Sequence, residues 1–339
     1  MSVTIKDVAK LAKVAPSTVS RVIANNPRIS EQTKNRVREA MESLGYHPNY
    51  NARSLANRST QSIGLVMPSS VDKVFQNPFF PEVIRGISTK AHEEDFAIYM
   101  STGQSEQESL EGVERMIHGG RVDGVIILYS SIDDKIMSFL QKEKFPFSVI
   151  GKPYNNFTQI THVDNDNVQA GKDVTDYLIQ LGHKRIAFVC GSLDSVVSID
   201  RILGYKKALQ NAKITYQEEY IVKEEFLHDG GVKEISRLMS LQSPPTALIV
   251  KDDLLSFSIM STIDNMGYSI PKDLSIVSFN NLMLSEFARP PLTTVDIDIF
   301  KLGYHAADCL LDQIKNPGQD AKQVIVPHRL VVRQTSQRI

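Results

Sequence analysis

Apolar residues recur at helical spacing in three short stretches near the N-terminus, and polar residues fill the positions between them. The apolar positions are Ile5, Val8, Leu11, Ala12, Val19, Val22, Ile23, Val37, Ala40, Met41 and Leu44. A spacing of three and four residues puts such side chains on one face of an α-helix. The chain is therefore predicted to begin with three short amphipathic helices.

The residues at the ends of these stretches are typical of helix boundaries. Thr4 and Asp7 have the spacing of a capping box, in which each side chain bonds the backbone amide of the other residue. Pro16 suits the start of the second helix, because the amide proton it lacks would be unpaired there. Ser30 is expected to cap the third helix, and Gly45 to end it. Two short helices joined by a tight turn predict a helix-turn-helix, with a generic three-helix bundle as the alternative.

From residue 62 onward, apolar runs of strand length alternate with helical stretches. The runs predicted to be strands span residues 63–67, 97–100, 124–128, 147–150, 186–189, 247–250 and 275–279. Such alternation predicts parallel sheets built from βαβ units. In sheets of this kind, ligands bind near the carboxyl ends of the strands.

The length of 339 residues suits a large domain joined to a small one. No apolar run approaches the ~20 residues needed to cross a bilayer, and the N-terminus lacks the apolar core of a signal peptide. Cys190 and Cys309 are too few for a disulfide framework, so a cytoplasmic protein without membrane contact is expected. Because no Cys/His cluster has metal-ligand spacing, neither a metal nor a cofactor is predicted.

The overall net charge of −1 conceals an asymmetry along the chain. Residues 1–60 carry ten Lys and Arg against four Asp and Glu, a net charge of +6, which leaves −7 for residues 61–339. A basic head on an acidic body is typical of a nucleic-acid-binding module attached to a body that avoids phosphates. A solvated basic helix face would give a similar count.

Several motifs make the chain resemble the lactose/galactose-repressor (LacI/GalR) family. In the first part they are residues 3–9 (VTIKDVA), 17–22 (STVSRV), 45–49 (GYHPN) and 52–56 (ARSLA). In the second part they are residues 163–165 (VDN), 181–183 (LGH), 204–205 (GY), 208–209 (AL) and 291–295 (PLTTV). The resemblance covers essentially the whole chain.

The resemblance implies an all-α helix-turn-helix headpiece and an α/β body with the periplasmic-binding-protein architecture. The headpiece would span residues 1–48, the hinge helix and linker 49–61, and the body 62–339. The body would consist of two doubly wound parallel-sheet lobes around a cleft. The first lobe would contain about 62–161 and 295–323, and the second about 162–294 and 324–339.

The resemblance also implies which residues contact DNA. Pro16, Ser17 and Arg21 occupy the positions that read base edges in the major groove, and arginine is the natural bidentate partner of guanine. The candidate DNA-binding residues are Thr4, Pro16, Ser17, Thr18, Ser20, Arg21, Asn25, Arg53, Leu55, Ala56 and Arg58. Two positions depart from the family pattern. Lys13 stands where glycine is usual and is expected to need a left-handed backbone, and Ala15 forfeits a cap worth ~0.5–2 kcal/mol.

Residues 49–57 could form a helix of only about two turns, below the ~12–15 residues at which isolated helices become stable. We expect this segment to be disordered in the free protein and to fold when paired with its twin on DNA. Leu55 would then insert into the minor groove, with a core leucine as the alternative, and Arg53 and Arg58 would contact phosphates. The body would control DNA binding by moving the anchor points of the two hinges.

Candidate effector-binding residues follow the predicted strands. The family resemblance supports four of them as effector contacts, namely Arg201, Phe226, Asp252 and Asn280. The candidates are Phe79, Phe80, Lys152, Arg201, Phe226, Asp252 and Asn280. Charged planar groups above an apolar ring suit a polyhydroxyl ligand. Phe79 and Phe80 could instead belong to the core, Lys152 to the surface, and Asp296 and Asp298 are interpreted as solvated turn charges. The family's usual Phe-Asp-Asp is Phe279-Asn280-Asn281 here, which replaces a carboxylate with an amide that also donates.

These features together predict a transcriptional repressor of a carbohydrate-utilisation operon, acting as a homodimer on operator DNA. Residues 14–27 and 279–281 look most like the maltose-operon branch of the family, which implies maltose or a maltodextrin as effector. A catabolite-control-type regulator activated by a phosphorylated carrier protein is the alternative. A transported-sugar receptor is a further alternative, but it would need a signal peptide, which the N-terminus lacks. Neither a P-loop nor a G-x-S-x-G motif is present, so no catalytic residue or enzyme activity is expected.

Overall fold

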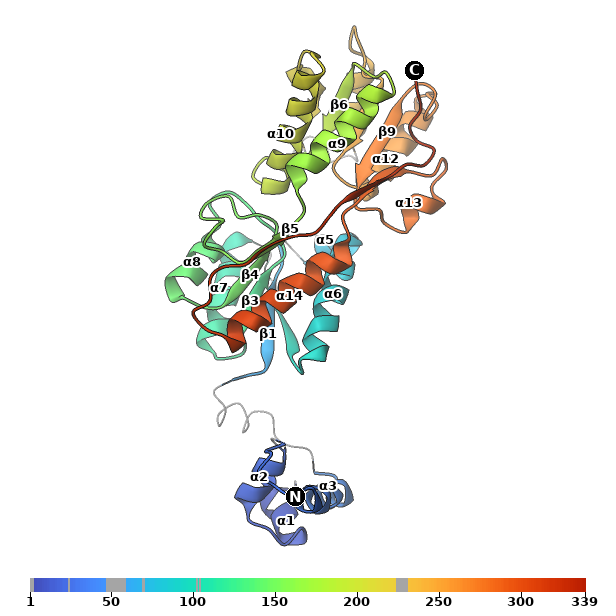
Figure 1. Cartoon of the computed structure of the whole chain (residues 1–339). Coiled ribbons are helices and arrows are strands. Elements are labelled where there is room, and N and C mark those ends of the chain that lie inside the picture. The colour runs from blue at the N-terminus through green and yellow to red at the C-terminus, as the bar shows by residue number, and fades with distance from the viewer. Residues whose placement is uncertain are drawn as a thin grey trace. The chain divides into compact units, whose positions relative to one another are not determined.

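The computed structural model describes residues 3–23, 25–46, 59–68, 71–101, 103, 105–223 and 231–339. The chain divides into two compact units, Met1–Thr60 and Gln61–Ile339 (Figure 1). Each unit has its own buried apolar core.

The first unit contains helices α1 (Ile5–Leu11), α2 (Pro16–Ile23) and α3 (Glu31–Leu44). Helix α1 begins after Thr4, as predicted. The carboxylate of Asp7, in the first turn, accepts hydrogen bonds from the backbone amide of Thr4 at 2.9 Å and from the hydroxyl of Thr4 at 2.7 Å. Ser30 caps α3, and Gly45 ends it in the left-handed conformation at φ 60°. The predicted boundaries of all three helices are therefore confirmed to within one residue.

The turn between α1 and α2 contains Lys13 at φ 53°, as expected from its place where the family usually has glycine. A left-handed backbone costs a non-glycine residue on the order of 1 kcal/mol. The packing of the helices offsets this strain, since Val8, Val19 and Val37 are completely buried between them.

The second unit is built on two six-stranded sheets. The first sheet has the order β11-β5-β4-β3-β1-β2, and all of its neighbouring strands are parallel. Its strands are β1 (Ser62–Val66), β2 (Ala97–Ser101), β3 (Gly124–Ile127), β4 (Phe147–Ile150), β5 (His162–Asp164) and β11 (Gln323–Ile325). We call this sheet and its helices the first lobe.

The second sheet has the order β12-β10-β9-β8-β6-β7 and is parallel except for the pair β10–β12. Its strands are β6 (Ile186–Val189), β7 (Ile221–Val222), β8 (Ala247–Val250), β9 (Ser275–Phe279), β10 (Thr293–Asp296) and β12 (Arg329–Val331). We call this sheet and its helices the second lobe. The predicted fold class, a helix-turn-helix unit followed by two parallel-sheet lobes, is confirmed.

Helices cover both sheets (Figure 1). Those of the first lobe are α5 (Val71–Gln76), α6 (Phe79–Glu93), α7 (Glu106–His118), α8 (Lys135–Glu143) and α14 (Ile299–Lys315). Those of the second lobe are α9 (Asn167–Gln180), α10 (Val196–Asn211), α11 (Val232–Met239), α12 (Asp253–Asn265) and α13 (Leu284–Phe287), with a 3-10 turn at Glu218–Tyr220. Where α9 and α10 touch, a Cβ on Gly204 would lie 2.0 Å from the carbonyl oxygen of Val168, so this helix pair requires glycine there.

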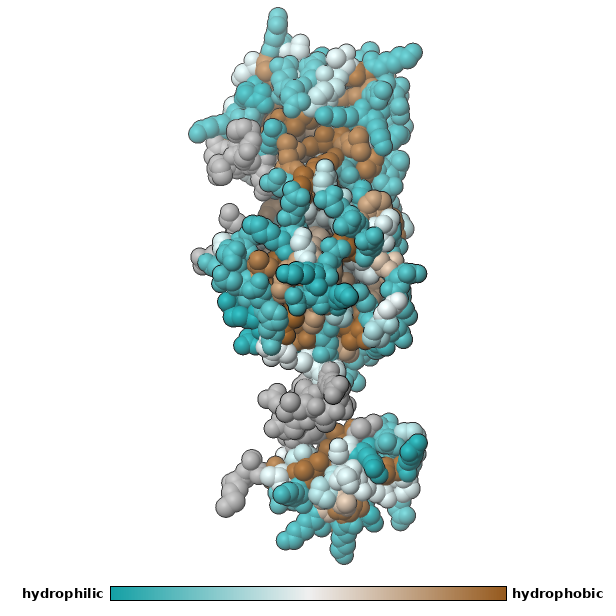
Figure 2. Space-filling view, turned by 90° about the vertical axis from the view of Figure 1, so that its left-hand side faces the viewer, coloured by the Kyte–Doolittle hydropathy of each residue, from teal (hydrophilic) through white to brown (hydrophobic). Residues whose placement is uncertain are grey.

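The chain crosses between the lobes three times, at residues 165–166, 297–298 and 326–328. The segment after α14 runs from the first lobe to the second in Figure 1. Because β5 belongs to the first sheet and β10 to the second, each crossing lies a few residues C-terminal to the expected lobe boundary. On the face shown in Figure 2, apolar residues gather around a hollow in the second lobe, and hydrophilic residues cover most of the remainder.

Candidate DNA-reading helix and interlobe ligand site

Helix α2 presents a polar face to solvent. Val19 and Val22 are buried and hold the helix against α1 and α3. The other face carries donor and acceptor groups of small size. Its exposed candidates are Pro16, Ser17, Ser20 and Arg21, and Thr18 is half-buried. This is the arrangement that base reading in the major groove requires.

The remaining DNA-binding candidates are distributed more widely. Thr4 and Asn25 are exposed near the N-terminal end of α1 and just after α2, respectively. The candidates Arg53, Leu55, Ala56 and Arg58 and the predicted hinge segment 49–57 lie outside the described residues, as does the effector candidate Phe226.

Arg201 of α10 lies at the carboxyl ends of strands β8 and β9 and is only 7% exposed. Its Nε donates to the side-chain oxygen of Asn167 at 2.9 Å, and its Nη1 donates to the carbonyl oxygen of Lys251 at 3.0 Å. The guanidinium carbon lies 3.8 Å from the ring centroid of Phe279. These contacts leave Nη2 without a hydrogen-bond partner among the described residues. A fixed, buried guanidinium with a free donor is suited to binding an acceptor on a ligand.

Burial lowers the pKa of Arg201 to about 10, and the nearby carboxylates of Asp164, Asp252 and Asp253 partly oppose this effect. The guanidinium therefore remains charged at neutral pH. Asp252 caps α12 by accepting a 2.8 Å hydrogen bond from the amide of Leu255. Its second carboxylate oxygen makes no hydrogen bond to another described residue, so it is available to a ligand hydroxyl.

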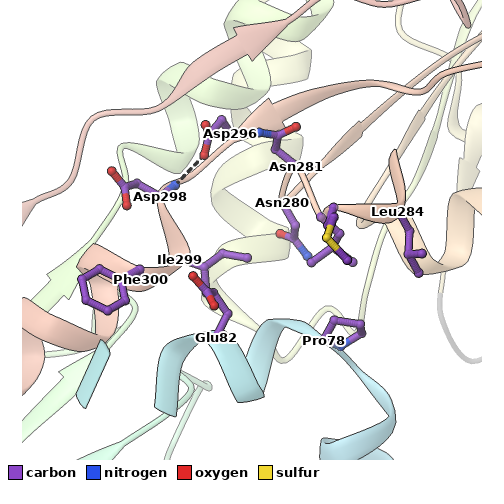
Figure 3. Close-up of a pocket in the computed structure, with 11 residues that line it drawn as sticks. Pro78, Glu82, Asn280, Asn281, Leu284, Asp296, Asp298, Ile299 and Phe300 are labelled. Carbon is purple, nitrogen blue, oxygen red and sulfur yellow. Dashed lines mark hydrogen bonds between the residues drawn. The ribbon is translucent and has the colours of Figure 1, made fainter. Parts of the chain in front are cut away.

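Asn280 follows β9 directly, is only 8% exposed and adopts φ 109°. It lines a cavity of about 620 Å³ between the two lobes, which is large enough for a small molecule (Figure 3). The lining comes from α6, the loop after β9 and the segment between β10 and α14. It consists of Pro78, Glu82, Asn280, Asn281, Leu282, Met283, Leu284, Asp296, Asp298, Ile299 and Phe300. In Figure 3, Glu82 and Asn280 approach the same space from opposite lobes.

Each carboxylate in this lining is paired with a cation that does not line the cavity. Glu82 pairs with Arg85 at 2.6 Å, Asp296 with Arg329 at 3.1 Å, and Asp298 with Lys301 at 2.7 Å. The cavity wall is largely apolar, and its paired carboxylates therefore give it no large net charge. Asp296 and Asp298 are half-buried, so these turn charges also border the cavity.

Phe79 and Phe80 pack against the main apolar core, with ring centroids 5.2 Å apart in an edge-to-face arrangement. They do not line the 620 Å³ cavity, although the neighbouring Pro78 does. Lys152 follows β4 in the first lobe and forms a 3.0 Å salt bridge to Asp200 of the second lobe. The structure thus brings Arg201, Asp252 and Asn280 to one region and places Lys152 on a link between the lobes.

Sequence reasoning missed the first-lobe wall of the cavity, formed by Glu82, Ile299 and Phe300. Ile299 and Phe300 begin α14 immediately after a crossing. The signal that could have found them is their position, since they are the first residues of a helix that follows directly after a crossing between the lobes. Glu82 has no such signal, because it lies within α6 among ordinary surface charges.

In the described part of the chain, no group of three or more His, Cys, Asp or Glu residues has the geometry to hold a metal ion. None of the helices described is both long and apolar enough to cross a membrane.

Comparison with known proteins decides the family. Residues 4–49 match the model of bacterial regulatory proteins of the lacI family, and residues 175–336 match the periplasmic-binding-protein-like domain. The transcriptional regulator MalR of Streptococcus pneumoniae serotype 4 is 42% identical over 339 residues, covering 98% of this chain and 99% of its own length. The chain belongs to the LacI family. It is a DNA-binding transcriptional regulator and not an enzyme, as expected.

Other LacI-family proteins are similar along the full length. Catabolite control protein A of Priestia megaterium is 33% identical, with 99% of this chain and 100% of that protein covered. The structure of the regulator CelR in complex with cellobiose has a TM-score of 0.76 at 30% identity, over 98% of this chain and all of that one. The operator-bound lac repressor dimer, at 24% identity and a TM-score of 0.84 over 99% of this chain and all of that one, supports the fold alone.

Proposed function

We propose that this LacI-family regulator represses a carbohydrate-utilisation operon and that maltose or a maltodextrin, bound between the lobes, controls it. The observation that carries the proposal is the interlobe cavity, which is lined by Asn280 and by internally paired carboxylates. Arg201 and Asp252 do not line this cavity, but the guanidinium of Arg201 lies over the ring of Phe279, the residue before Asn280. Sugar hydroxyls both donate and accept hydrogen bonds. The amide of Asn280 offers both functions, Arg201 offers a donor and Asp252 an acceptor.

The charge balance of the cavity supports a neutral ligand over an anionic one. Three half-buried carboxylates face or border the space, and the cations that neutralise them do not line it. An anion would bring a further negative charge close to Glu82, Asp296 and Asp298. Pro78 and Ile299 supply apolar surface of the kind that covers a sugar ring. The relative named MalR and the relative solved with cellobiose agree with a sugar effector.

At the DNA end, we assign base reading to the exposed face of α2, with Arg21 contacting guanine and Pro16 and Ser17 beside it. Residues 49–57 and Leu55, which lie outside the described residues, would form the paired minor-groove helices. The ligand would change operator affinity by moving the anchor points of the two hinges.

We further propose a homodimer that uses the face around α12 and α13 in the second lobe. Four large apolar side chains are exposed there, at 39% for Leu254, 76% for Met283, 48% for Leu284 and 63% for Phe287. Exposed apolar patches of this kind mark interaction surfaces. A second copy is the occupant that a two-fold operator requires, since each copy supplies one headpiece.

The direct test is the affinity of the full chain for an operator duplex, which can be selected by the protein itself from a random-sequence library. Binding is measured at one stated salt concentration, with and without maltose, and with sorbitol as a matched neutral polyol. We expect maltose to change operator affinity and sorbitol to leave it unchanged. Binding of maltose without any effect on the operator would overturn ligand control, and failure to select any duplex would overturn DNA reading.

A catabolite-control-type regulator is the second candidate, favoured by the 33% identity to a protein of that name. In that case a phosphorylated carrier protein would promote DNA binding. Adding the phosphorylated carrier to the same assay separates the two functions. Tighter operator binding with the phosphorylated carrier, and not with its unphosphorylated form, would favour the alternative.

A further inference from the structure

The three crossings between the lobes are joined by one side chain. Asn165 lies on the first crossing and is only 4% exposed. Its amide nitrogen donates to the carbonyl oxygen of Ile297 at 3.0 Å, on the second crossing. The same nitrogen donates to the carbonyl oxygen of Val326 at 2.8 Å, on the third. The side chain of Asn165 therefore ties the three crossings to one another.

A continuous path of hydrogen bonds leads from Asn165 to the ligand site. The carboxylate of Asp164 accepts from the backbone amide of Asn165 at 2.8 Å and from the side-chain amide of Asn167 at 2.9 Å. The oxygen of Asn167 in turn accepts from Nε of Arg201 at 2.9 Å. Only two side chains, those of Asp164 and Asn167, therefore separate Arg201 from the crossing at Asn165.

The groups in this path are buried and have little freedom to rearrange. Arg201 is also fixed by the carbonyl of Lys251 and the ring of Phe279, so a change in its position is transmitted to Asn167. The second oxygen of Asp164 accepts from the backbone amide of Lys152 at 3.0 Å, which ties the path to the first lobe as well. A buried, connected network of this kind is a physical route by which a displacement at one site reaches another.

We propose that Asn165 and Asn167 are positioning residues that link a ligand bound at Arg201 to the three crossings, and so couple the cleft to the lobe arrangement that sets operator affinity. This inference rests on the proposed function, because it takes Arg201 as a ligand contact. Asn167 fixes the orientation of the Arg201 guanidinium that would contact the ligand. Asn165 transmits a displacement of Arg201 to the crossings and does not itself contact the ligand.

The test separates ligand affinity from coupling in the full-length protein. Maltose affinity is measured by titration calorimetry, and operator affinity with and without saturating maltose at fixed salt. The coupling factor is the ratio of the two operator affinities, typically ~5–150-fold in allosteric proteins. The variants are N165A, N167A and N167D. N211A is the matched control, because Asn211 is exposed at the C-terminal end of α10 and lies outside the path.

In N165A we expect maltose affinity within ~3-fold of wild type and a coupling factor reduced at least ~5-fold. N167A should lose ~10-fold in maltose affinity, because Nε of Arg201 loses its acceptor. N167D restores that acceptor and should recover maltose affinity. It should not recover coupling, because it places a carboxylate against Asp164. A purely structural role would not separate these two quantities.

A wild-type coupling factor in N165A, at a melting temperature matching N211A, would overturn the relay while leaving sugar control intact. If N165A is unfolded at the assay temperature, N167D decides, and wild-type coupling in that variant also overturns the relay. A wild-type protein that binds neither maltose nor maltotriose overturns the proposed sugar effector, and the relay with it.

Discussion

The buried carboxylate of Asp253 accepts a 2.7 Å hydrogen bond from the backbone amide of Leu282, which joins the start of α12 to the loop after β9. The same carboxylate accepts from the hydroxyls of Ser278, Thr294 and Ser285. Burial raises the pKa of Asp253, and these four hydrogen bonds oppose the shift. One side chain thereby fixes the loop that begins at Asn280 in the cavity and leads into α13.

Replacing Asp253 with alanine should lower the free energy of unfolding by at least ~3 kcal/mol, because four buried donors lose their acceptor. Urea denaturation of the full chain, followed by circular dichroism, measures this loss. D252A is the matched control, since the neighbouring carboxylate accepts only the amide of Leu255 and a cap is worth ~1 kcal/mol. Equal stability of D253A and D252A would show that the four bonds do not hold the loop.

The buried carboxyl group of Asp164 predicts a pH dependence of stability. Burial raises its pKa to about 6 from the model-compound value of 3.8. Between these two values the folded chain holds a proton that the unfolded chain has lost, so this group's contribution to stability falls as pH rises from ~4 to ~6. Asp164→Asn removes the titration. We expect the free energy of unfolding of D164N relative to wild type to rise across this interval.

The measurement compares urea midpoints of wild type and D164N at half-unit steps of pH. D164N will be less stable in absolute terms, because an amide cannot accept all three hydrogen bonds made by the carboxylate. The difference between the two curves is therefore the readout. A difference that stays constant from pH 4 to pH 6.5 would contradict a raised pKa for Asp164.

Arg21→Ala should weaken specific operator binding by ~1–3 kcal/mol and leave maltose affinity unchanged, because the side chain is exposed on α2 and a bidentate contact to guanine would be lost. Arg28→Ala is the control, since it removes an exposed positive charge from the same unit outside α2. Fluorescence anisotropy with operator and random-sequence duplexes separates the two effects. If R21A and R28A weaken both duplexes equally, Arg21 contacts phosphate and does not read a base.

The elements found from the sequence were those with strong local signals. Thr4, Ser30 and Gly45 marked the ends of helices through their capping chemistry, and seven apolar runs predicted strands to within one residue. The five missed strands, β5, β7, β10, β11 and β12, are two to four residues long. A segment that short has too few positions to show a period, and its pairing depends on neighbours distant in sequence.

The ligand site was predictable only where residues follow strands. Arg201, Asp252 and Asn280 were found because family position and strand ends both point to them. Asn165 was recognised as part of a motif but not as the junction of the crossings. Its two acceptors belong to Ile297 and Val326, more than 130 residues away, and only the tertiary fold brings them to it. The cavity's wall on α6 depends on lobe packing in the same way.

Phe287→Glu should dissociate the proposed dimer, because it puts a charge into the apolar face of α13, where Phe287 is 63% exposed. Truncating a central interface side chain costs ~2–4 kcal/mol, and a buried unpaired charge adds to this, so we expect the dimer dissociation constant to rise at least ~30-fold. Leu203→Glu is the control, at 42% exposure on α10, which lies across the second lobe from α13 in Figure 1. Sedimentation velocity over a range of concentrations measures both variants, and operator affinity should fall only in F287E. Unchanged self-association of F287E, with L203E also unchanged, would place the dimer interface elsewhere.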